Sequence, residues 1–315
     1  MTSLQARGRG LALPVFFPAV SSVKDDHPLA LHLELLATLG APTALTSAYD
    51  WVRAFPGNAE GSRAAYFAWS ASGGTMILDS GRYEAYWHRD STWRHEDYVR
   101  VALELMPTFV MCFDEPAGEE TAEEQAAAAE MAWQRDQNAL VNSTVVPIVH
   151  GHPESLPTAV SLVATRTLPP LIAVAERELG DGIVARSVTV RRIVDALSST
   201  GNTVPLHVLG AGSPTSVLIL AHAGAQSFDG LEWNRTVVDF DTARLHHTQH
   251  YDFFQTQSAV PEEGSYWARV LTHNLIFWRR WINRIRSGEA GSMLEQYLPP
   301  MAGDHLALFG SDTAR

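Results

Sequence analysis

HVLGAGSP, residues 207–214, and SFDGLEWNR, residues 227–235, lie close together in the last third of this sequence. Each opens with a short apolar run of the kind that forms a buried strand, and then passes into a polar turn. In the second stretch Asp229 follows the apolar residues directly. A barrel of alternating strands and helices places its catalytic groups at this point, the carboxyl end of a strand. On its own, however, an aspartate here is equally well explained as a turn or helix-capping residue.

Apolar runs of strand length recur along the whole chain, and helical patterns separate most of them. Eight strand candidates begin at Leu11, Ala41, Gly73, Pro107, Ser143, Leu168, Thr203 and Ala225. Residues 66–70 are assigned to the third of these strands. Helices are expected at residues 27–40, 95–105, 119–141, 156–165, 187–199 and 215–223. Eight alternations in one chain predict an α/β fold, a (β/α)8 TIM barrel, over residues 1–256.

A carboxyl-terminal helical extension, residues 257–315, is expected to pack on the barrel. Its pattern is helical from Tyr266 to Leu298. An inward-facing apolar stripe is formed by Leu275, Trp278, Ile282 and Ile285. Arg279 and Arg280 fall on the other faces of this helix. They are candidates for contacting a nucleic-acid backbone, and an ordinary solvated helix face explains them equally well.

Composition sets limits on the protein class. The chain has 315 residues, 46% of them hydrophobic, which is enough for one barrel-sized core. A formal charge of -12 argues against a nonspecific nucleic-acid binder but permits a local basic patch. The single cysteine, Cys112, excludes an internal disulfide and a cysteine-rich zinc site. No apolar run reaches the ~20 residues needed to span a bilayer, so we expect a soluble cytoplasmic protein without a membrane partner.

Three carboxylates occupy the same context at the ends of predicted strands: Asp79, Asp114 and Asp229. The barrel would bring them to one rim although they are far apart in sequence. Several acids at one rim suggest chemistry at a glycosidic bond, in which one carboxylate captures the sugar and another moves a proton on the leaving group. A third acid can recognise a base by accepting hydrogen bonds from its N–H groups.

The segments that carry these acids resemble those of the guanine transglycosylases, tRNA-type enzymes that exchange guanine for a 7-deazaguanine base. HVLGAGSP and SFDGLEWNR are similar to the signatures of that family's strands 7 and 8. The other similarities are MILDSGRYE to DSGG(F/Y)Q, CFDEP to FDEC, IVHGH to VQGG, LIAVAE to GLAVGE, and HNLIFWRRWINRIR to the family's HN-aromatic carboxyl-terminal helix. The matches occur in the family's order and cover most of the chain.

The resemblance implies a role for each matching residue. Asp229 would be the nucleophile that forms a covalent glycosyl-enzyme, and Asp79 the general acid and base. Asp114 would recognise the guanine edge. The other implied base contacts are His150, at a glutamine position, Tyr83 as the stacking aromatic, Leu209 and Gly210 on the other side, and the backbone of Leu171, Ile172 and Ala173. Arg235 and Arg82 would contact the nucleic-acid backbone.

Departures from the family pattern narrow the expected function. The CxCxxC cluster is missing and only His273 remains, so no structural zinc and no other cofactor are expected. His246, His247 and His250 lack the geometry expected of a metal site. His150 in place of glutamine, Arg82 in place of glycine and Pro116 in place of cysteine alter the base pocket. The family includes DNA-acting relatives, and loss of the zinc cluster leads us to prefer DNA slightly over tRNA.

The sequence therefore predicts a glycosyltransferase that replaces guanine in a nucleic acid with a 7-deazaguanine such as 7-cyano-7-deazaguanine. Three alternatives stay open: a tRNA-guanine transglycosylase proper, an enzyme acting on free nucleosides or nucleotides, and a catalytically inactive binding subunit. The expected partners are DNA or tRNA, the free base, and a second copy of the chain or a partner subunit.

Overall fold

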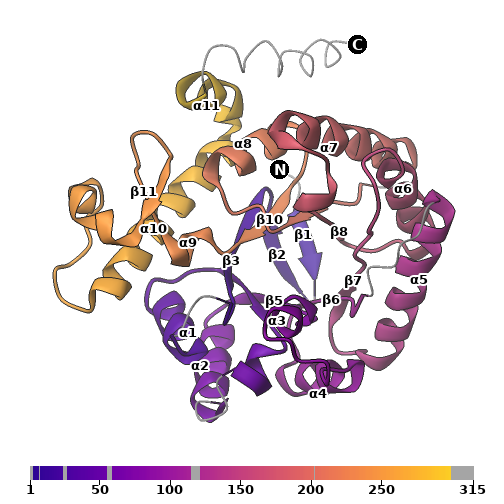
Figure 1. The fold of residues 1–315 in the computed structure, drawn as a ribbon, viewed down its shortest axis with the longest axis horizontal. Helices are drawn as coiled ribbons and strands as arrows, with labels where there is room; N and C mark the ends of the chain where they lie inside the picture. The colour runs from indigo at the N-terminus through magenta and orange to yellow at the C-terminus, as the bar shows by residue number, and fades with distance from the viewer. Residues whose placement is uncertain are drawn as a thin grey trace.

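The computed structural model describes residues 3–6, 8–23, 27–54, 59–114, 121–201 and 203–298. Eight parallel strands form one sheet that curves into a nearly closed barrel surrounded by helices (Figure 1). The strands are β3 (Val15–Val20), β4 (Thr43–Ser47), β5 (Thr75–Asp79), β6 (Phe109–Met111), β7 (Thr144–Val146), β8 (Ile172–Ala175), β9 (Leu206–Leu209) and β10 (Ser227–Gly230). Their order is β7-β6-β5-β4-β3-β10-β9-β8, and a parallel bridge from Ile148 to Ala173 links the two ends. The predicted TIM barrel is confirmed.

Helices occupy every connection between consecutive barrel strands. They are α1 (Leu29–Thr38), α2 (Ala59–Ala71), α3 (Arg82–Trp87), α4 (His95–Leu105), α5 (Ala122–Ala139), α6 (Leu156–Thr167), α7 (Gly182–Ser199), α8 (Pro214–His222) and, after the last strand, α9 (Glu232–Arg235). Thr121 begins α5 with a capping box, since its hydroxyl accepts from the Glu124 amide while the Glu124 carboxylate accepts from the Thr121 amide. The connections are therefore those of a βα-repeat, which places all strand carboxyl ends at one rim.

One assignment made from the sequence is wrong. Residues 66–70 were expected in a strand, and they lie in α2 instead. The buried residues of α2 are Ser62, Ala65, Tyr66 and Trp69. Their successive spacings of three, one and three residues place them on one face of a helix, whereas a strand would bury every second residue. Trp69 is fixed there by its indole N–H, which donates to the Ala41 carbonyl at 2.8 Å.

The core has two layers. Side chains that point into the barrel, such as Phe17, Ile77 and Phe109, form one buried cluster, and those between strands and helices form a larger one. Strands buried on both faces read as continuous apolar runs, which explains why the sequence located all eight.

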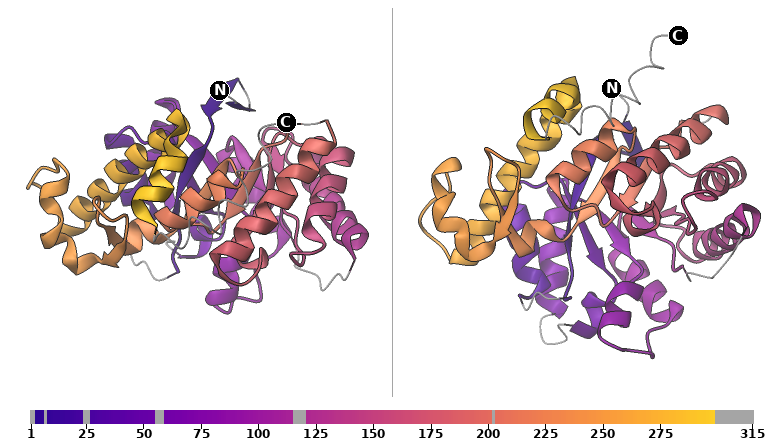
Figure 2. Two further views of the ribbon diagram at one scale, coloured as in Figure 1. Left: turned by 90° about the horizontal axis from the view of Figure 1, so that it is seen from above. Right: turned by 45° about the horizontal axis from the view of Figure 1, so that its top comes forward.

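Two antiparallel hairpins were not predicted. β1 (Ser3–Ala6) and β2 (Arg9–Ala12) pair across the end of the barrel, where Leu4 and Ala6 join the interior cluster (Figure 2). Because Leu11 and Ala12 belong to this hairpin, the first barrel strand begins at Val15, later than expected. The second hairpin, β11 (Thr236–Val238) with β12 (Leu245–His247), follows the last barrel strand.

The helical extension lies along one side of the barrel, as predicted (Figures 1 and 2). It consists of α10 (Tyr266–Arg284), a π-helical turn Ile285–Glu289 and α11 (Ala290–Tyr297). All four residues of the predicted stripe are buried, and Trp278 stacks on Phe16 of β3 with ring centroids 3.8 Å apart. Residues 299–315 of the predicted extension lie outside the described residues. No helix among the described residues is long and apolar enough to cross a membrane.

Candidate active site

A pocket of about 640 Å³ opens at the rim formed by the carboxyl ends of the strands. It brings together most of the residues singled out from the sequence. These are Asp79, Arg82, Tyr83, Asp114, His150, Leu209, Gly210, Asp229 and Arg235. The structure therefore places all three strand-end aspartates in one cavity, which is the arrangement that the barrel was expected to produce.

Asp229 is the third residue of β10, and residues of β9 and of the turn after it hold its side chain. Its Oδ1 accepts hydrogen bonds from the backbone N–H of Gly210 at 3.0 Å and from Nε2 of His207 at 3.1 Å. His207 is completely buried, and its Nδ1 lies 2.7 Å from the hydroxyl of Ser227. The neutral tautomer with the proton on Nε2 satisfies both contacts, because the ring then donates to Asp229 and accepts from Ser227. Both donors bind Oδ1, so these contacts leave Oδ2 facing the pocket without using it.

Two glycines make this close approach possible. Gly230 packs against the turn after β9, and a Cβ added to it would lie 2.2 Å from the Cα of Gly212. Gly210 has φ of 82°, in the left-handed region that favours glycine. The GAGSP segment is therefore a tight turn at the end of a barrel strand, in agreement with the polar turn expected from the sequence.

Asp79 ends β5 and is partly buried in the same pocket as the other two acids. The backbone N–H of Gly81 donates to its Oδ2 at 3.2 Å. Burial, together with the nearby charges of Asp114 and Asp229, raises the pKa of Asp79 to about 7. A carboxyl group with that pKa can both give and take a proton near neutral pH, which is what a general acid and base requires.

Glu84 is a further acid in the same pocket that the sequence analysis did not select. It lies on α3, and its Oε1 accepts a hydrogen bond from the Ser21 hydroxyl at 2.5 Å. Burial and the charge of Asp79 raise the pKa of Glu84 to about 7. Asp79 and the buried Glu84 are therefore two neighbouring carboxyls that compete for protons in the same pH range.

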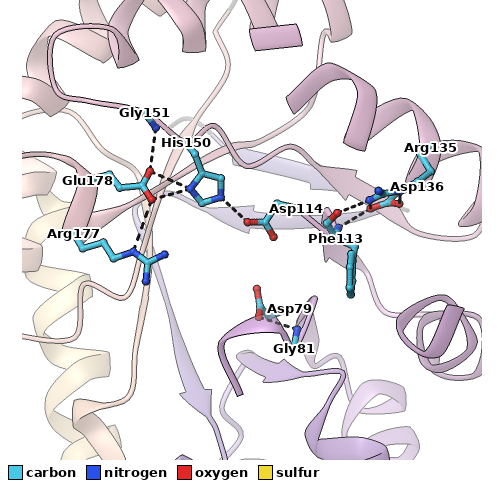
Figure 3. Close-up of polar contacts among 10 residues, drawn as sticks. All are labelled: Asp79, Gly81, Phe113, Asp114, Arg135, Asp136, His150, Gly151, Arg177 and Glu178. Atoms are coloured by element: carbon cyan, nitrogen blue, oxygen red, sulfur yellow. Dashed lines mark hydrogen bonds and ion pairs between the residues drawn. The ribbon is translucent and has the colours of Figure 1, made fainter. Parts of the chain in front are cut away.

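His150 joins two carboxylates in the wall of the pocket (Figure 3). Its Nε2 lies 2.5 Å from Oδ2 of Asp114, and its Nδ1 lies 2.8 Å from Oε1 of Glu178. Burial opposes the charged form of the ring, but the hydrogen bonds to Asp114 and Glu178 outweigh it and raise the pKa of His150 to about 9. Glu178 was not predicted, because it stands three residues beyond the end of β8 and no strand pattern selects it.

The strand end that carries Asp114 is anchored from behind by α5. The backbone N–H of Phe113 donates to Oδ2 of the buried Asp136 at 2.7 Å, and Arg135 donates to the Phe113 carbonyl (Figure 3). His95 also contacts Asp136, with Nε2 at 2.7 Å from Oδ1. Asp136 is thus a structural carboxylate that fixes where β6 ends.

The three β8 residues predicted to contact the base lie deeper than expected. Leu171, Ile172 and Ala173 are fully buried and do not line the pocket. The backbone of Ala173 is already used in the sheet, since its N–H donates to the Pro147 carbonyl and its carbonyl accepts from Val149. The end of the same strand lines the pocket instead, through Ala175 and Glu176.

Glu176 adds another negative charge to this wall and has its own partner. Its Oε1 lies 3.0 Å from Nη1 of Arg186. Burial raises the pKa of Glu176, and the positive charge of Arg186 opposes that effect.

The four candidate arginines divide between two places. Arg82 and Arg235 line the pocket. Arg279 donates to the carbonyls of Leu39, at 2.7 Å, and Gly40, at 3.3 Å, in the connection that leads into the amino end of β4. Arg280 lies over the Phe240 ring at 5.6 Å from its centroid. Arg279 and Arg280 are therefore not part of the pocket, and they do not extend its rim into a basic groove.

Both ring nitrogens of His273, the one residue that the resemblance retained from a zinc site, have hydrogen-bond partners. His273 is buried, with Nδ1 2.6 Å from the Ser258 hydroxyl and Nε2 2.8 Å from the Val238 carbonyl. Among the residues that the structure describes, no group of three or more His, Cys, Asp and Glu side chains could hold a metal ion.

Comparison with known proteins adds no assignment: no family model matches the chain, and no curated protein matches it. The class that can be stated is a TIM barrel with an acid-rich pocket at the carboxyl ends of its strands.

Proposed function

We propose that this protein is a base-exchange N-glycosyltransferase that removes guanine from a nucleic acid, DNA slightly preferred over tRNA, and inserts a 7-deazaguanine such as 7-cyano-7-deazaguanine. The observation that carries the proposal is the pairing of Asp229 with Asp79 in one pocket. Asp229 is oriented by His207 and Gly210, and the pKa of Asp79 is raised to about 7. A fixed nucleophile beside a proton carrier is the combination that substitution at a glycosidic carbon requires.

The proposed reaction has two steps. Oδ2 of Asp229 attacks C1′ of the sugar and forms a C–O ester bond, while the C1′–N9 bond breaks and its electron pair leaves with guanine. Protonated Asp79 supplies the proton to the departing base. In the second step the ionised Asp79 takes the N9 proton of the incoming base, whose N9 attacks C1′ and restores the free Asp229 carboxylate. Two displacements retain the configuration at C1′.

Base binding is assigned to residues on the two sides of the pocket. Tyr83 and Leu209 both line it and provide the apolar faces between which an extruded base can stack. Asp114 supplies the acceptor for the N–H groups of the guanine edge. Arg82 and Arg235 at the rim are available to the adjacent phosphates.

One observation favours a second candidate, an enzyme that acts on a free nucleotide. A polynucleotide would be supported by a broad basic rim, and the carboxyl-terminal arginines were expected to contribute to it. Arg279 instead binds backbone carbonyls near the amino end of the barrel, and Arg286 donates to the Pro14 carbonyl at 2.8 Å. The basic residues that line the pocket are thus Arg82, Arg177 and Arg235, which is enough for a few phosphates but not for a long basic groove.

The experiment that tests the proposal is base exchange on three substrates in parallel. The protein is incubated with double-stranded DNA, tRNA or dGMP, together with 7-cyano-7-deazaguanine, and the products are analysed as nucleosides by mass spectrometry. Incorporation of deazaguanine into either polymer supports the proposal. Exchange of the guanine of dGMP for deazaguanine, with no incorporation into a polymer, supports the second candidate. Asp229→Asn is expected to abolish exchange, whereas the matched control Asp195→Asn, on the exposed face of α7, keeps it. Exchange on none of the three substrates would contradict both.

A further inference from the structure

The geometry around His150 fixes the charge of its ring. Each ring nitrogen faces a carboxylate oxygen: Nε2 faces Asp114 at 2.5 Å, and Nδ1 faces Glu178 at 2.8 and 3.0 Å. A neutral imidazole has only one N–H, so its other nitrogen would direct a lone pair at a carboxylate. The imidazolium donates from both nitrogens and satisfies both contacts. All three side chains are largely buried, which strengthens this preference.

Glu178 is itself held in place for this contact. Its Oε2 accepts a hydrogen bond from the backbone N–H of Gly151 at 3.2 Å, so the carboxylate is tied to the loop that carries His150. Arg177 approaches the other oxygen only at 3.8 Å, and its side chain is mostly exposed to solvent. His150 is therefore the principal positive partner of Glu178.

The charges around this group come from several elements. Asp114 follows β6, Glu178 and Arg177 follow β8, and Asp79, Asp229 and Arg82 face the same pocket from other strand ends. A second cavity that His150 and Glu178 also line adds the titratable and charged side chains of His152, Glu154, Asp181 and Arg192. Asp114 is one of the charges that raise the pKa of Asp79. An imidazolium against Asp114 offsets that charge, so the protonation of His150 affects the acid on the opposite side of the pocket as well.

Resting on the function proposed above, we propose that Glu178 is a specificity-determining positioning residue. Glu178 holds His150 as an imidazolium against Oδ2 of Asp114. This contact orients the Asp114 carboxylate to accept hydrogen bonds from the N–H edge of a neutral guanine-like base. Glu178 acts through His150 and Asp114, so it is a positioning residue rather than a catalytic one. Base affinity should decline as pH rises through about 9, where His150 loses its proton.

The decisive variant is Glu178→Gln. Glutamine keeps the shape of the side chain and an acceptor for Nδ1–H, but it removes the negative charge that favours the imidazolium. The titration midpoint of His150 is expected to fall by about 1 pH unit or more. At pH 8.5 a midpoint that falls from about 9 to about 8 reduces the protonated fraction of His150 about 3-fold, so the variant should bind guanine at least about 3-fold more weakly than the wild type, with little change in kcat. At pH 6 the imidazolium returns without the help of Glu178, so the affinity of the variant should recover. A purely structural role would not be rescued by acid.

Two measurements test these expectations. The first is a histidine NMR titration of the free protein, with the His150 resonance assigned through His150→Gln. The second is the Kd for guanine and for 7-cyano-7-deazaguanine at pH 6 and pH 8.5, by calorimetry. Glu34→Gln serves as the matched control, because Glu34 is an exposed acid on α1 that lines neither of the cavities bordered by His150.

The outcomes separate this inference from the proposed function. Base binding together with a His150 midpoint near 6.5 would overturn the role of Glu178 and leave the proposed function standing. Equal weakening of Glu178→Gln at both pH values, or no weakening at either, would do the same. A His150 midpoint near 9 in a wild-type protein that binds neither base would overturn the proposed function and the base-reading role of Glu178 together.

Discussion

His207 and Asp229 form a buried pair on adjacent strands, with Nε2 of the histidine 3.1 Å from Oδ1 of the aspartate. In the register of β9 and β10, His207 is the partner of Ser227, which contacts its other ring nitrogen. A chain of hydrogen bonds thus runs from Ser227 through His207 to Asp229, the candidate nucleophile. The buried His207 ring fixes Oδ1 of Asp229, and the proposed mechanism uses the other oxygen, Oδ2, for the attack on the sugar.

Replacement of His207 tests this orientation. His207→Leu removes the donor to Asp229 and should lower the rate of guanine release on the order of 100-fold, because small displacements of a reacting group are costly. His207→Gln retains an N–H donor on a side chain of similar reach, so it should keep more activity than the leucine variant. Single-turnover guanine release measures both. Full activity in a folded His207→Leu variant would show that Asp229 needs no such support.

The burial of Asp79 predicts a stability that depends on pH. Its pKa is raised from 3.8 to about 7, so the stabilising contribution of the protonated group is fully present below about pH 4 and is lost as pH rises to about 7. Asp79→Asn does not titrate. The variant should therefore have a higher Tm than the wild type at pH 8, by the equivalent of roughly 2–4 kcal/mol, and a smaller advantage at pH 4. Thermal unfolding by circular dichroism across this range gives the comparison. A difference in Tm that does not change with pH would contradict the assignment.

Glu84 should influence the pKa of Asp79, the proposed general acid and base. Glu84→Gln removes a nearby negative charge and keeps an acceptor for the Ser21 hydroxyl, so Asp79 should release its proton at lower pH. In the proposed mechanism guanine release requires protonated Asp79, so release should fall in the wild type above about pH 7. In the variant the midpoint of this decline should shift down by about 1 pH unit. The pH profile of single-turnover release measures it, and an unchanged or upward shift would argue against electrostatic coupling of the two acids.

The arginines provide a paired test of the nucleic-acid surface. Arg235 lines the pocket, whereas Arg279 binds carbonyl groups near the amino end of β4. Arg235→Gln should weaken DNA binding and reduce the slope of log affinity against log salt by about 1, the effect of one lost phosphate contact. Arg279→Gln should leave that slope unchanged and lower only the stability. Fluorescence anisotropy at several salt concentrations distinguishes them, and a reduced slope for Arg279→Gln would place the nucleic acid elsewhere.

How far the sequence predicts this protein depends on the element. The barrel strands were found because each is a continuous apolar run that ends in a polar turn, as the runs to Asp79 and Asp229 illustrate. The hairpin β1–β2 was missed because four-residue strands carry too few residues to show alternation. Residues 66–70 were misassigned because a short apolar run fits a strand and a buried helix face equally well.

The residues of the candidate site also differ in how far the sequence predicts them. Fold topology alone brings Asp79, Asp114 and Asp229 to one rim, so their meeting could be predicted. The partners His207, Glu84 and Glu178 could not, because each depends on which side chains of neighbouring elements face one another. The sequence offered one signal for His207: it stands two residues before Leu209 in β9, so both side chains lie on the same face of the strand.

Trapping the covalent intermediate tests the central claim most directly. The protein is mixed with a guanine-containing polynucleotide in the absence of an incoming base, quenched in denaturant, and analysed by intact mass and peptide mapping, with Asp229→Asn in parallel. We predict release of guanine in proportion to an ester-linked adduct on the peptide that contains Asp229, and neither product from the variant. Guanine release with the adduct on another residue, or undiminished release by Asp229→Asn, would contradict the account.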